Sequence, residues 1–571
     1  MKLHRGARAI GHARNALLLG ALTLVGAAAP APLLSVTLEP GVINTEAGTG
    51  HIDVELAAEA ADTPAGAPLL TMPIVVANTD TVAGTLQDLL VSDARGPVPL
   101  TVRDDSEAIA YSRHWIAGRD VKGTLVIRYR APVDNTPPVR GSGPPYGLRT
   151  EGGGVSGAGM AFLLLPETQR PYRLAIRWKL AALGAGATGT SSYGDGDVVV
   201  ATPGPAGRLS SSVFMAGPLR REPRGSAPGF SSAWLGEPPF DPRPLMRWTH
   251  RLHGWMSGFF RDAETPPYRV FARFNPINAG GGAALTNSFL VTYGRNTDPE
   301  DLKGTLAHEM VHTWTGSTAG QWYGEGIAVH YQALLPWRAR LITTAEFLED
   351  LNQTAARYYA NPLNDTPNAE IAPHFWEDSR IRVLPYDRGG LYFAVLDGRI
   401  RDSSGGRRSL DDLVRVMVDR RRKGETTDEA AWLALVTGEL GEPGRALHGS
   451  MLAGGLMLPD SDDFGPCFRR TTGRIRRFEL GFDPKSLVGA VKTIRGLKAG
   501  SEAAKAGLRD GDVVTYAAAI DGIQGDPKRT LTLQVTRNGR TFPLTYPPRG
   551  EVVDIWQWAR APGVPESACR Y

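Results

Sequence analysis

The chain has 571 residues, which is too long for one hydrophobic core, so roughly two to four domains are expected. Hydrophobic residues make up 42% and charged residues 21%, which is ordinary for globular proteins and excludes fibrous and wholly disordered classes. A formal net charge of only +4 gives no large positive field, so we do not expect nucleic acid as a partner.

The first 27 residues have the pattern of a secretory signal peptide. An apolar run from 16 to 25 is preceded by four basic residues, Lys2, Arg5, Arg8 and Arg14, and followed by small residues. We expect cleavage after Ala27, which would leave a formal charge of zero. The alternative is an uncleaved membrane anchor, although the run is short for a bilayer span. The pattern predicts a periplasmic or secreted protein, with no stable membrane span once the signal is removed.

From about residue 33 to 235, runs of β-favouring residues alternate with Gly, Pro, Asn and Asp, for example at 123–130 and 171–178. This alternation predicts a β-sandwich-like domain with one face of each sheet buried. A Gly/Pro-rich stretch at 217–239 predicts the domain boundary, and we interpret its basic run at 220–224 as a solvated linker.

Between about 240 and 460 the hydrophobic pattern becomes helical, as at 246–260 and 410–418. Two β-like stretches, 268–274 and 288–293, interrupt it early and predict a small sheet beside the helices. We therefore expect a mainly helical domain after the boundary.

The segment 299–314 predicts a helix, because a proline opens it and acidic residues lie in its first turn. It contains His308-Glu309-Met310-Val311-His312. Two histidines four positions apart lie on one face of a helix, where their nitrogens can share one ion. This spacing predicts one Zn²⁺ per chain, with Glu309 beside the metal and not bound to it.

A second apolar helical run, 322–331, can deliver Glu325 as a third ligand. Two histidines and one carboxylate leave a fourth position for water, which is the pattern of a catalytic zinc site. We expect zinc to lower the pKa of such a water towards ~7, and Glu309 to accept its proton and pass it to a leaving amine. The alternative, that the histidines are ordinary packed residues, is disfavoured by Glu325, and His330 is interpreted as a structural or supporting residue.

The HExxH helix followed by Gly324-Glu325-Gly326 resembles the gluzincin metallopeptidases, and the whole layout is similar to the glycyl aminopeptidase family of that clan. The resemblance implies an N-terminal β domain, a thermolysin-like catalytic domain and a PDZ domain. It also implies zinc-dependent hydrolysis of peptide bonds. We therefore expect a multidomain α+β protein, divided into 28–235, 236–465 and 466–571.

The segment Pro385-Tyr386-Asp387-Arg388-Gly389 is similar to the Tyr-x-Lys/Arg-Gly segment that follows the zinc helices in this clan. The resemblance implies that Tyr386 donates its phenol hydrogen to the oxyanion formed during hydrolysis. A tyrosine at a helix start is otherwise common packing. The family-like segment 407–413 is interpreted as a helix cap.

One departure from the family pattern concerns substrate recognition. Aminopeptidases of this clan carry Gly-x-x-Glu on an edge strand before the zinc helix, and its carboxylate binds the free amino group of the substrate. With the glycines aligned, Ala284 stands in the place of that glutamate, after Gly282 and Ala283. Since alanine cannot pair with an ammonium ion, we hypothesise relaxed or altered end recognition, as an aminopeptidase or an endopeptidase. The strand can still bind a peptide through its backbone.

Two segments near the C terminus, Glu479-Leu480-Gly481-Phe482 and 499–514, resemble PDZ domains. The resemblance implies that backbone N–H groups of Leu480, Gly481 and Phe482 bind the C-terminal carboxylate of a peptide that adds a strand to the sheet. The alternative is a PDZ-like fold that only braces the catalytic domain.

The two cysteines, Cys467 and Cys569, bracket this C-terminal domain. In an oxidising compartment they can form a disulfide that ties the end of the chain to the base of the domain. The spacing alone leaves the pairing open.

The sequence thus predicts a zinc peptidase that acts on peptide or protein substrates, with protein C-termini as a further partner at the PDZ domain. The rival hypothesis is a peptide-binding scaffold with a decayed catalytic domain. Retention of all three metal ligands and of Glu309 argues against decay.

Overall fold

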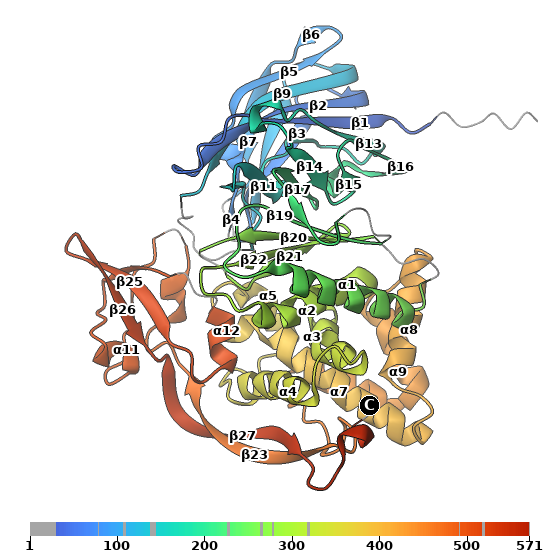
Figure 1. Cartoon of the computed structure of the whole chain (residues 1–571), viewed down its shortest axis with the longest axis vertical. Helices are drawn as coiled ribbons and strands as arrows, with labels where there is room; N and C mark the ends of the chain where they lie inside the picture. Colours follow the sequence, from blue (N-terminus) through green and yellow to red (C-terminus); the bar gives the residue numbers. More distant parts are fainter. Residues whose placement is uncertain are drawn as a thin grey trace, which may run out of the picture.

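The fold is that of a multidomain α+β protein, with a β-rich N-terminal part, a helical part and a C-terminal part that lies across the helices (Figure 1). The computed structural model describes residues 30–77, 79–106, 110–136, 144–224, 229–262, 267–276, 279–316, 320–489, 491–516 and 520–569. The expected signal peptide at 1–27 lies outside the described residues. Among the helices that are described, none has the length and apolarity needed to cross a membrane.

Within the described residues, the N-terminal part forms three sheets. The first has the strand order β16-β13-β1-β2-β9-β5-β6 and comprises β1 (Leu33–Pro40), β2 (Thr49–Thr63), β5 (Gln87–Asp93), β6 (Gly96–Pro97), β9 (Val121–Asp134), β13 (Pro171–Trp178) and β16 (Val198–Pro205). The second has the order β12-β3-β8-β7, with β4 beside β3, and comprises β3 (Pro68–Val76), β4 (Thr79–Asp80), β7 (Leu100–Asp104), β8 (Tyr111–Ala117) and β12 (Leu165–Pro166). The third has the order β10-β11-β17-β14-β15 and comprises β10 (Arg149–Glu151), β11 (Gly154–Ala158), β14 (Thr188–Ser191), β15 (Gly194–Asp195) and β17 (Val213–Gly217).

The first two sheets share one hydrophobic core. Leu34 and Val36 of β1 are buried at alternate positions, and they belong to the same core as Leu70 and Met72 of β3. Side chains alternate between the two faces of a strand, so one face of each sheet supplies this core. This arrangement is sandwich-like, as the alternation in the sequence predicts.

A further sheet supports the helical part. Its order is β18-β19-β20-β22-β21, with β18 (Arg220–Arg221), β19 (Phe230–Trp234), β20 (Tyr268–Phe274), β21 (Gly282–Leu285) and β22 (Ser288–Tyr293). The sequence predicts only a small sheet from 268–274 and 288–293, and assigns 220–224 to a linker. In the structure Arg220 and Arg221 pair with β19, and β19 runs parallel to β20. The sheet therefore extends back into the region that the sequence predicts as the domain boundary. The sequence does not reveal this, because pairing between distant segments leaves no local signal.

The helices form one large core beneath this sheet (Figure 1). They are α1 (Pro242–Phe259), α2 (Leu302–Thr315), α3 (Gln321–Arg338), α4 (Thr344–Tyr359), α5 (Asn368–His374), α6 (Ser379–Arg382), α7 (Leu384–Ser404), α8 (Leu410–Arg422), α9 (Glu429–Leu440) and α10 (Glu442–Leu452). Asp241 caps α1, and Thr343 and Glu346 form a capping box at α4. The segment 407–413 behaves as predicted, since Ser409 and Asp412 form a capping box at the start of α8.

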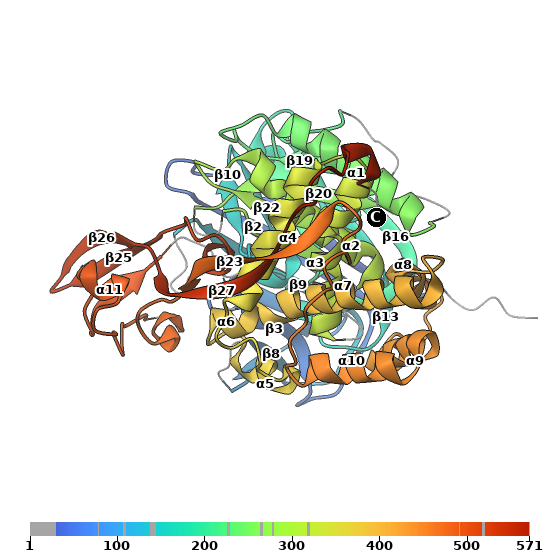
Figure 2. The same ribbon diagram turned by 90° about the horizontal axis from the view of Figure 1, so that it is seen from below.

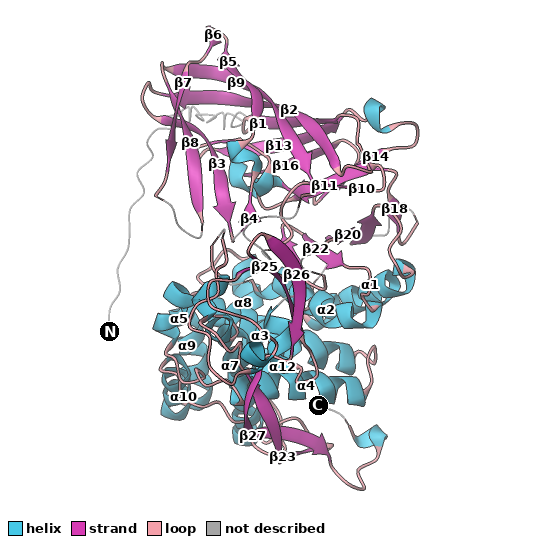
Figure 3. Ribbon diagram, turned by 90° about the vertical axis from the view of Figure 1, so that its left-hand side faces the viewer, coloured by secondary structure: helices cyan, strands magenta, loops and turns pink. Residues whose placement is uncertain are grey.

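The C-terminal part consists of a long two-stranded ribbon and a small module. The ribbon pairs β23 (Phe468–Phe478) with β27 (Arg549–Arg560), runs beneath the helical part (Figure 2) and is fastened to α4 by hydrogen bonds between Asn352 and the backbone of Trp558. The module contains α11 (Glu502–Lys505), α12 (Ile520–Gly525) and a sheet of β24 (Val513–Thr515), β25 (Leu531–Arg537) and β26 (Arg540–Tyr546). It has its own hydrophobic core, and α12 lies between that core and α4 (Figure 3).

Candidate metal centre

Helix α2 carries both histidines of the HExxH segment. Asp298 caps the short 3-10 turn Pro299–Asp301 that leads into it, and Gly316 ends it with a φ of 59°, a conformation that favours glycine. Leu306, Met310 and Val311 are fully buried in the helical core. The remaining face of α2 presents His308 and His312 towards α3.

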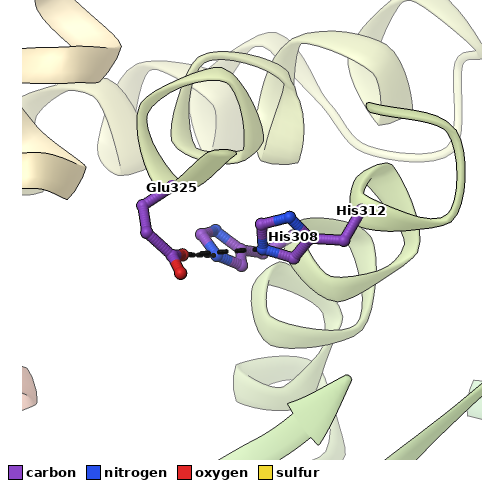
Figure 4. Close-up of side chains that lie close together, drawn as sticks. All are labelled: His308, His312 and Glu325. Carbon is purple, nitrogen blue, oxygen red and sulfur yellow. Dashed lines mark hydrogen bonds and ion pairs between the residues drawn. The ribbon is translucent and has the colours of Figure 1, made fainter. Parts of the chain in front are cut away.

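His308, His312 and Glu325 converge on one point (Figure 4). The Nε2 atom of His308 lies 3.1 Å from an oxygen of Glu325, and Nε2 of His312 lies 3.5 Å from the same oxygen. The three ligand atoms all lie within 4.8 Å of one another. The structure therefore brings together the three residues that the sequence predicts as ligands, from two helices.

This donor set fits zinc. Zn–N and Zn–O bonds of about 2.0–2.2 Å at tetrahedral angles separate the ligand atoms by roughly 3.3–3.6 Å. The two observed separations of 3.1 and 3.5 Å are close to that range. Two imidazoles and one carboxylate would hold the ion and leave one tetrahedral position free.

The charges of the site favour a carboxylate ligand. Burial by itself would raise the pKa of Glu325, but hydrogen bonds from His308 and His312 outweigh it and lower that pKa to about 2. Glu325 is therefore ionised at neutral pH, which is the form that binds a cation.

A second layer of hydrogen bonds orients His308. Its Nδ1 lies 3.0 Å from Oε1 of Gln332, and the amide nitrogen of Gln332 donates to Asp350 over 2.7 Å. With Nδ1–H donating to the amide oxygen, Nε2 is left free to bind a metal. Sequence reasoning missed both residues, although Gln332 follows Glu325 by seven positions on one helix and could have been placed on the same face.

Glu309 lies beside the ligands and beside the edge strand. Burial raises its pKa, while the imidazoles of His308 and His312 oppose that shift and Glu325 adds to it. The backbone N–H of Ala284 donates a hydrogen bond to the Glu309 carboxylate. The predicted base and the predicted substrate strand are thus neighbours.

Strand β21 is the edge of its sheet, since among the described strands it pairs only with β22. Ala283 points into the core, whereas Ala284 is exposed. Gly282 permits the pairing, because a Cβ at that position would lie 1.9 Å from the ring of Phe289. The other edge of β21 pairs with no described strand and faces Glu309.

Tyr386, in the first turn of α7, lies against one of the proposed ligands. Its ring stacks on that of His308, with 5.9 Å between the centroids. Burial raises the pKa of its phenol well above the usual value, and the carboxylates of Glu325 and Glu309 act in the same direction. Tyr386 stays protonated at neutral pH and can donate a hydrogen bond.

Asp387 and Arg388, the two residues that follow Tyr386 in the sequence motif, have structural roles. Asp387 is fully buried and forms a two-pronged ion pair with Arg357 of α4. Arg388 is also fully buried and donates to the backbone oxygens of Asn364 and Thr366 in the loop after α4. Both residues hold the start of α7 in place.

Tyr146, from the β-rich part, is a further group near the base that sequence reasoning missed. Burial raises the pKa of its phenol to about 12, and the carboxylate of Glu309 contributes to this shift. Tyr146 lies in an irregular segment without periodicity, so no sequence signal pointed to it.

The remaining predicted site residues lie elsewhere. His330 is not one of the three clustered ligand residues. It lines a small cavity between α3, α4 and α7, together with residues such as Asp350. Burial lowers the pKa of its imidazole to about 4. Leu480 and Phe482 are buried in the core of the C-terminal module, and Gly481 accepts a hydrogen bond from the backbone of Lys498. Cys467 and Cys569 are joined in a disulfide.

Comparisons with known proteins support the fold. No protein-family model and no curated protein matches the chain. Among solved structures, an aminopeptidase N family protein from Idiomarina loihiensis is similar with a TM-score of 0.60 and 14% identity, over 91% of this chain and 97% of that one. An M1 zinc metallopeptidase from Deinococcus radiodurans gives 0.45 and 15% over 75% and 95%, and yeast LTA4 hydrolase gives 0.47 and 14% over 75% and 68%. At such identities the likeness concerns the fold alone.

Proposed function

We propose that this chain is a zinc-dependent peptidase of the gluzincin type. The observation that carries the proposal is the convergence of His308, His312 and Glu325 within 4.8 Å, with Glu309 beside them. Their donor atoms suit one zinc ion per chain. The fold shared with the aminopeptidase N family protein is consistent with this reading.

The residues around the centre have complementary roles. A zinc ion bound there would polarise a water molecule and the substrate carbonyl. Glu309 accepts the proton of the attacking water and later delivers it to the leaving amine. Tyr386 donates its phenol hydrogen to the carbonyl oxygen as that oxygen becomes an oxyanion, and the backbone of β21 aligns the peptide.

Replacement of the base tests the assignment. Glu309→Gln keeps the shape of the side chain but cannot accept the proton, so we expect kcat to fall by roughly 10²–10⁴-fold with zinc content unchanged. A chelator should abolish wild-type hydrolysis. The control Glu300→Gln alters an exposed acid before the same helix and should leave kcat unchanged. Full activity of Glu309→Gln would contradict the proposal.

We further propose that recognition of free amino termini is weakened, because Ala284 stands where the resemblance predicts a glutamate. Ala284 is exposed beside Glu309, so its side chain offers no charge to a substrate ammonium group. We expect similar kcat/KM values for a free and an N-terminally acetylated peptide. Ala284→Glu should shift the ratio towards the free peptide, and strong rejection of the acetylated peptide by the wild type would contradict this proposal.

The finer assignment of the C-terminal module as a PDZ domain is also part of our proposal. It is supported by the separate core of the module and by the position of Leu480, Gly481 and Phe482 in a loop between elements. The residues after this loop form a short 3-10 turn at Pro484–Leu487 and not a strand, which favours a bracing role over peptide capture. A scaffold without catalysis would bind peptides without turnover, whereas the enzyme hydrolyses them.

We propose that the protein is periplasmic or secreted, because the sequence at 1–27 has the pattern of a secretory signal. The disulfide between Cys467 and Cys569 agrees with an oxidising compartment. Cell fractionation with an antibody against the catalytic domain tests this location.

A further inference from the structure

The C-terminal module reaches the neighbourhood of the metal centre through an ion pair. Asp521, on α12 of the module, accepts two hydrogen bonds from Arg382, at 2.9 Å from Nε and 2.7 Å from Nη2. The two residues are 139 positions apart in the sequence. Side-chain exposures of 21% for Arg382 and 37% for Asp521 place the pair partly out of solvent, where its geometry is strongly held.

Arg382 is the last residue of α6, and α7 begins at Leu384. Only Val383 separates the two helices, and it serves as the C-cap of α6 and the N-cap of α7. Tyr386 lies in the first turn of α7. A displacement of Arg382 would therefore pass directly to the backbone that carries Tyr386.

The same ion pair acts electrostatically on the phenol of Tyr386. Burial is the largest cause of the rise in the pKa of the phenol; the carboxylates of Glu325, Glu309 and Asp521 add to that rise, and the guanidinium of Arg382 opposes it. The ring of Tyr386 stacks on that of His308, and both charges of the Arg382–Asp521 pair act on its phenol.

Other contacts make the docking of α12 firm. Gly525 lies so close to α4 that an added Cβ would be 3.3 Å from the backbone oxygen of Gln353. On the side of the helical part, the guanidinium of Arg382 lies 5.7 Å from the ring centroid of Trp376, which helps to hold the arginine in place. A second ion pair, Lys485 with Glu377 at 3.2 Å, crosses the same interface with both partners substantially exposed.

We infer that Asp521 is a positioning residue for the peptidase reaction, which holds Tyr386 in its working position through Arg382. The inference rests on the proposed function. It makes catalysis depend on the docking of a module that follows the catalytic domain in the chain. The three ligands and Glu309 all lie on α2 and α3, whereas the module acts on the group that stabilises the oxyanion.

The variant Asp521→Asn tests the inference, since it keeps the shape and removes the charge. We expect kcat to fall about ten-fold with KM nearly unchanged and zinc content unchanged, because a small displacement of a catalytic group is costly. Arg382→Lys, which keeps the charge but loses the two-pronged bond, should act in the same direction. The matched control Lys485→Gln breaks the other ion pair of the interface and should leave kcat unchanged.

A double-mutant comparison separates positioning from general destabilisation. In a Tyr386→Phe background, Asp521→Asn should lower kcat by less than about two-fold, because the group through which it acts is already gone. If the two losses multiply, or if Asp521→Asn alone leaves kcat unchanged, the inference is overturned.

A readout without activity keeps this test separate from that of the proposed function. Hydrogen–deuterium exchange of the amides at 383–390 should speed up at least five-fold in Asp521→Asn and stay unchanged in Lys485→Gln. Unchanged exchange in both variants contradicts the coupling. Should the wild type show no zinc-dependent hydrolysis, the proposed function fails, while the exchange result still decides whether the module holds α7.

Discussion

At the scale of single residues, an uncharged side chain, the amide of Gln332, orients one of the proposed metal ligands, His308. Gln332 accepts the Nδ1 hydrogen of His308 with an amide oxygen, and its own amide group is fixed by Asp350. An amide in this place orients the ring without adding a negative charge next to the ligands. Among the three ligands, Glu325 would supply the negative charge that balances a bound metal ion.

Removal of Gln332 should weaken the site without removing a ligand. We expect Gln332→Ala to lower zinc affinity by roughly 10–100-fold, because groups that orient metal-bound histidines have effects of this size. Competition with a chromophoric chelator measures it. An unchanged affinity would show that packing alone orients His308.

Another buried residue, His253 of α1, should make stability depend on pH. It is fully buried and stacks on Tyr268, and burial lowers its pKa to about 4. Between about pH 6.5 and 4 the unfolded chain binds a proton there and the folded chain does not, so the unfolding free energy falls as the pH falls. The loss should be about 2 kcal/mol between pH 7.5 and 5.

The variant His253→Phe retains the aromatic ring and should remove this part of the acid sensitivity. Urea unfolding of both proteins at pH 7.5 and 5, with chelator present so that metal release plays no part, gives the comparison. Equal pH dependence in the two proteins would contradict the role of His253.

At the scale of elements, the close approach of α3 and α7 sets the distance between Glu325 and Tyr386. A Cβ added at Gly326 would lie 2.6 Å from the Cα of Gly389, so the helices touch through two glycines. Glu325 precedes one of these glycines, and Tyr386 lies three positions before the other. Gly326 and Gly389 are therefore needed for the packing of the two helices.

Gly326→Ala should push α3 away from α7. We expect about 1–3 kcal/mol of destabilisation from overpacking, together with weaker zinc binding because Glu325 moves. The control is Gly304→Ala in α2, where an added Cβ meets nothing within 4 Å, and it should be neutral or stabilising by up to about 1 kcal/mol. Thermal unfolding and zinc titration of both variants measure the difference.

At the scale of the whole molecule, the C-terminal part is held at several points along its length. The disulfide closes a segment of 102 residues that includes the ribbon and the module. Asn352 fastens the ribbon to α4 near the end that adjoins the disulfide, and the Arg382–Asp521 pair fastens the module to α6. The disulfide thus holds the C-terminal end of the chain next to Cys467, directly before the first strand of the ribbon.

Opening the disulfide should loosen this C-terminal part. We expect the double variant Cys467→Ser/Cys569→Ser to lose about 2–4 kcal/mol, because cross-links that close long segments restrict the unfolded chain most. The proteolysis rate of the segment after residue 466 and the unfolding midpoint, compared with the oxidised wild type, measure the loss. No change in either would show that the packing of the ribbon is sufficient.

Several features of this protein were determined by the sequence itself. The i, i+4 spacing of His308 and His312 on a helix is a local property, and so is the alternation that produces the β-rich part. The capping residues of α8 were likewise readable, because a cap acts on the turn that follows it. These predictions needed no knowledge of distant contacts.

The tertiary structure alone decided which distant groups meet. Three sets of contacts join segments far apart in the chain or on separate helices: the pairing of β18 and β19 with β20, the hydrogen bond of Gln332 to His308, and the contact of Asp521 with Arg382. Spacing in a sequence reports the period of one element, whereas such contacts depend on how elements pack. For that reason the metal ligands could be predicted from short motifs, and the residues that hold them in position could not.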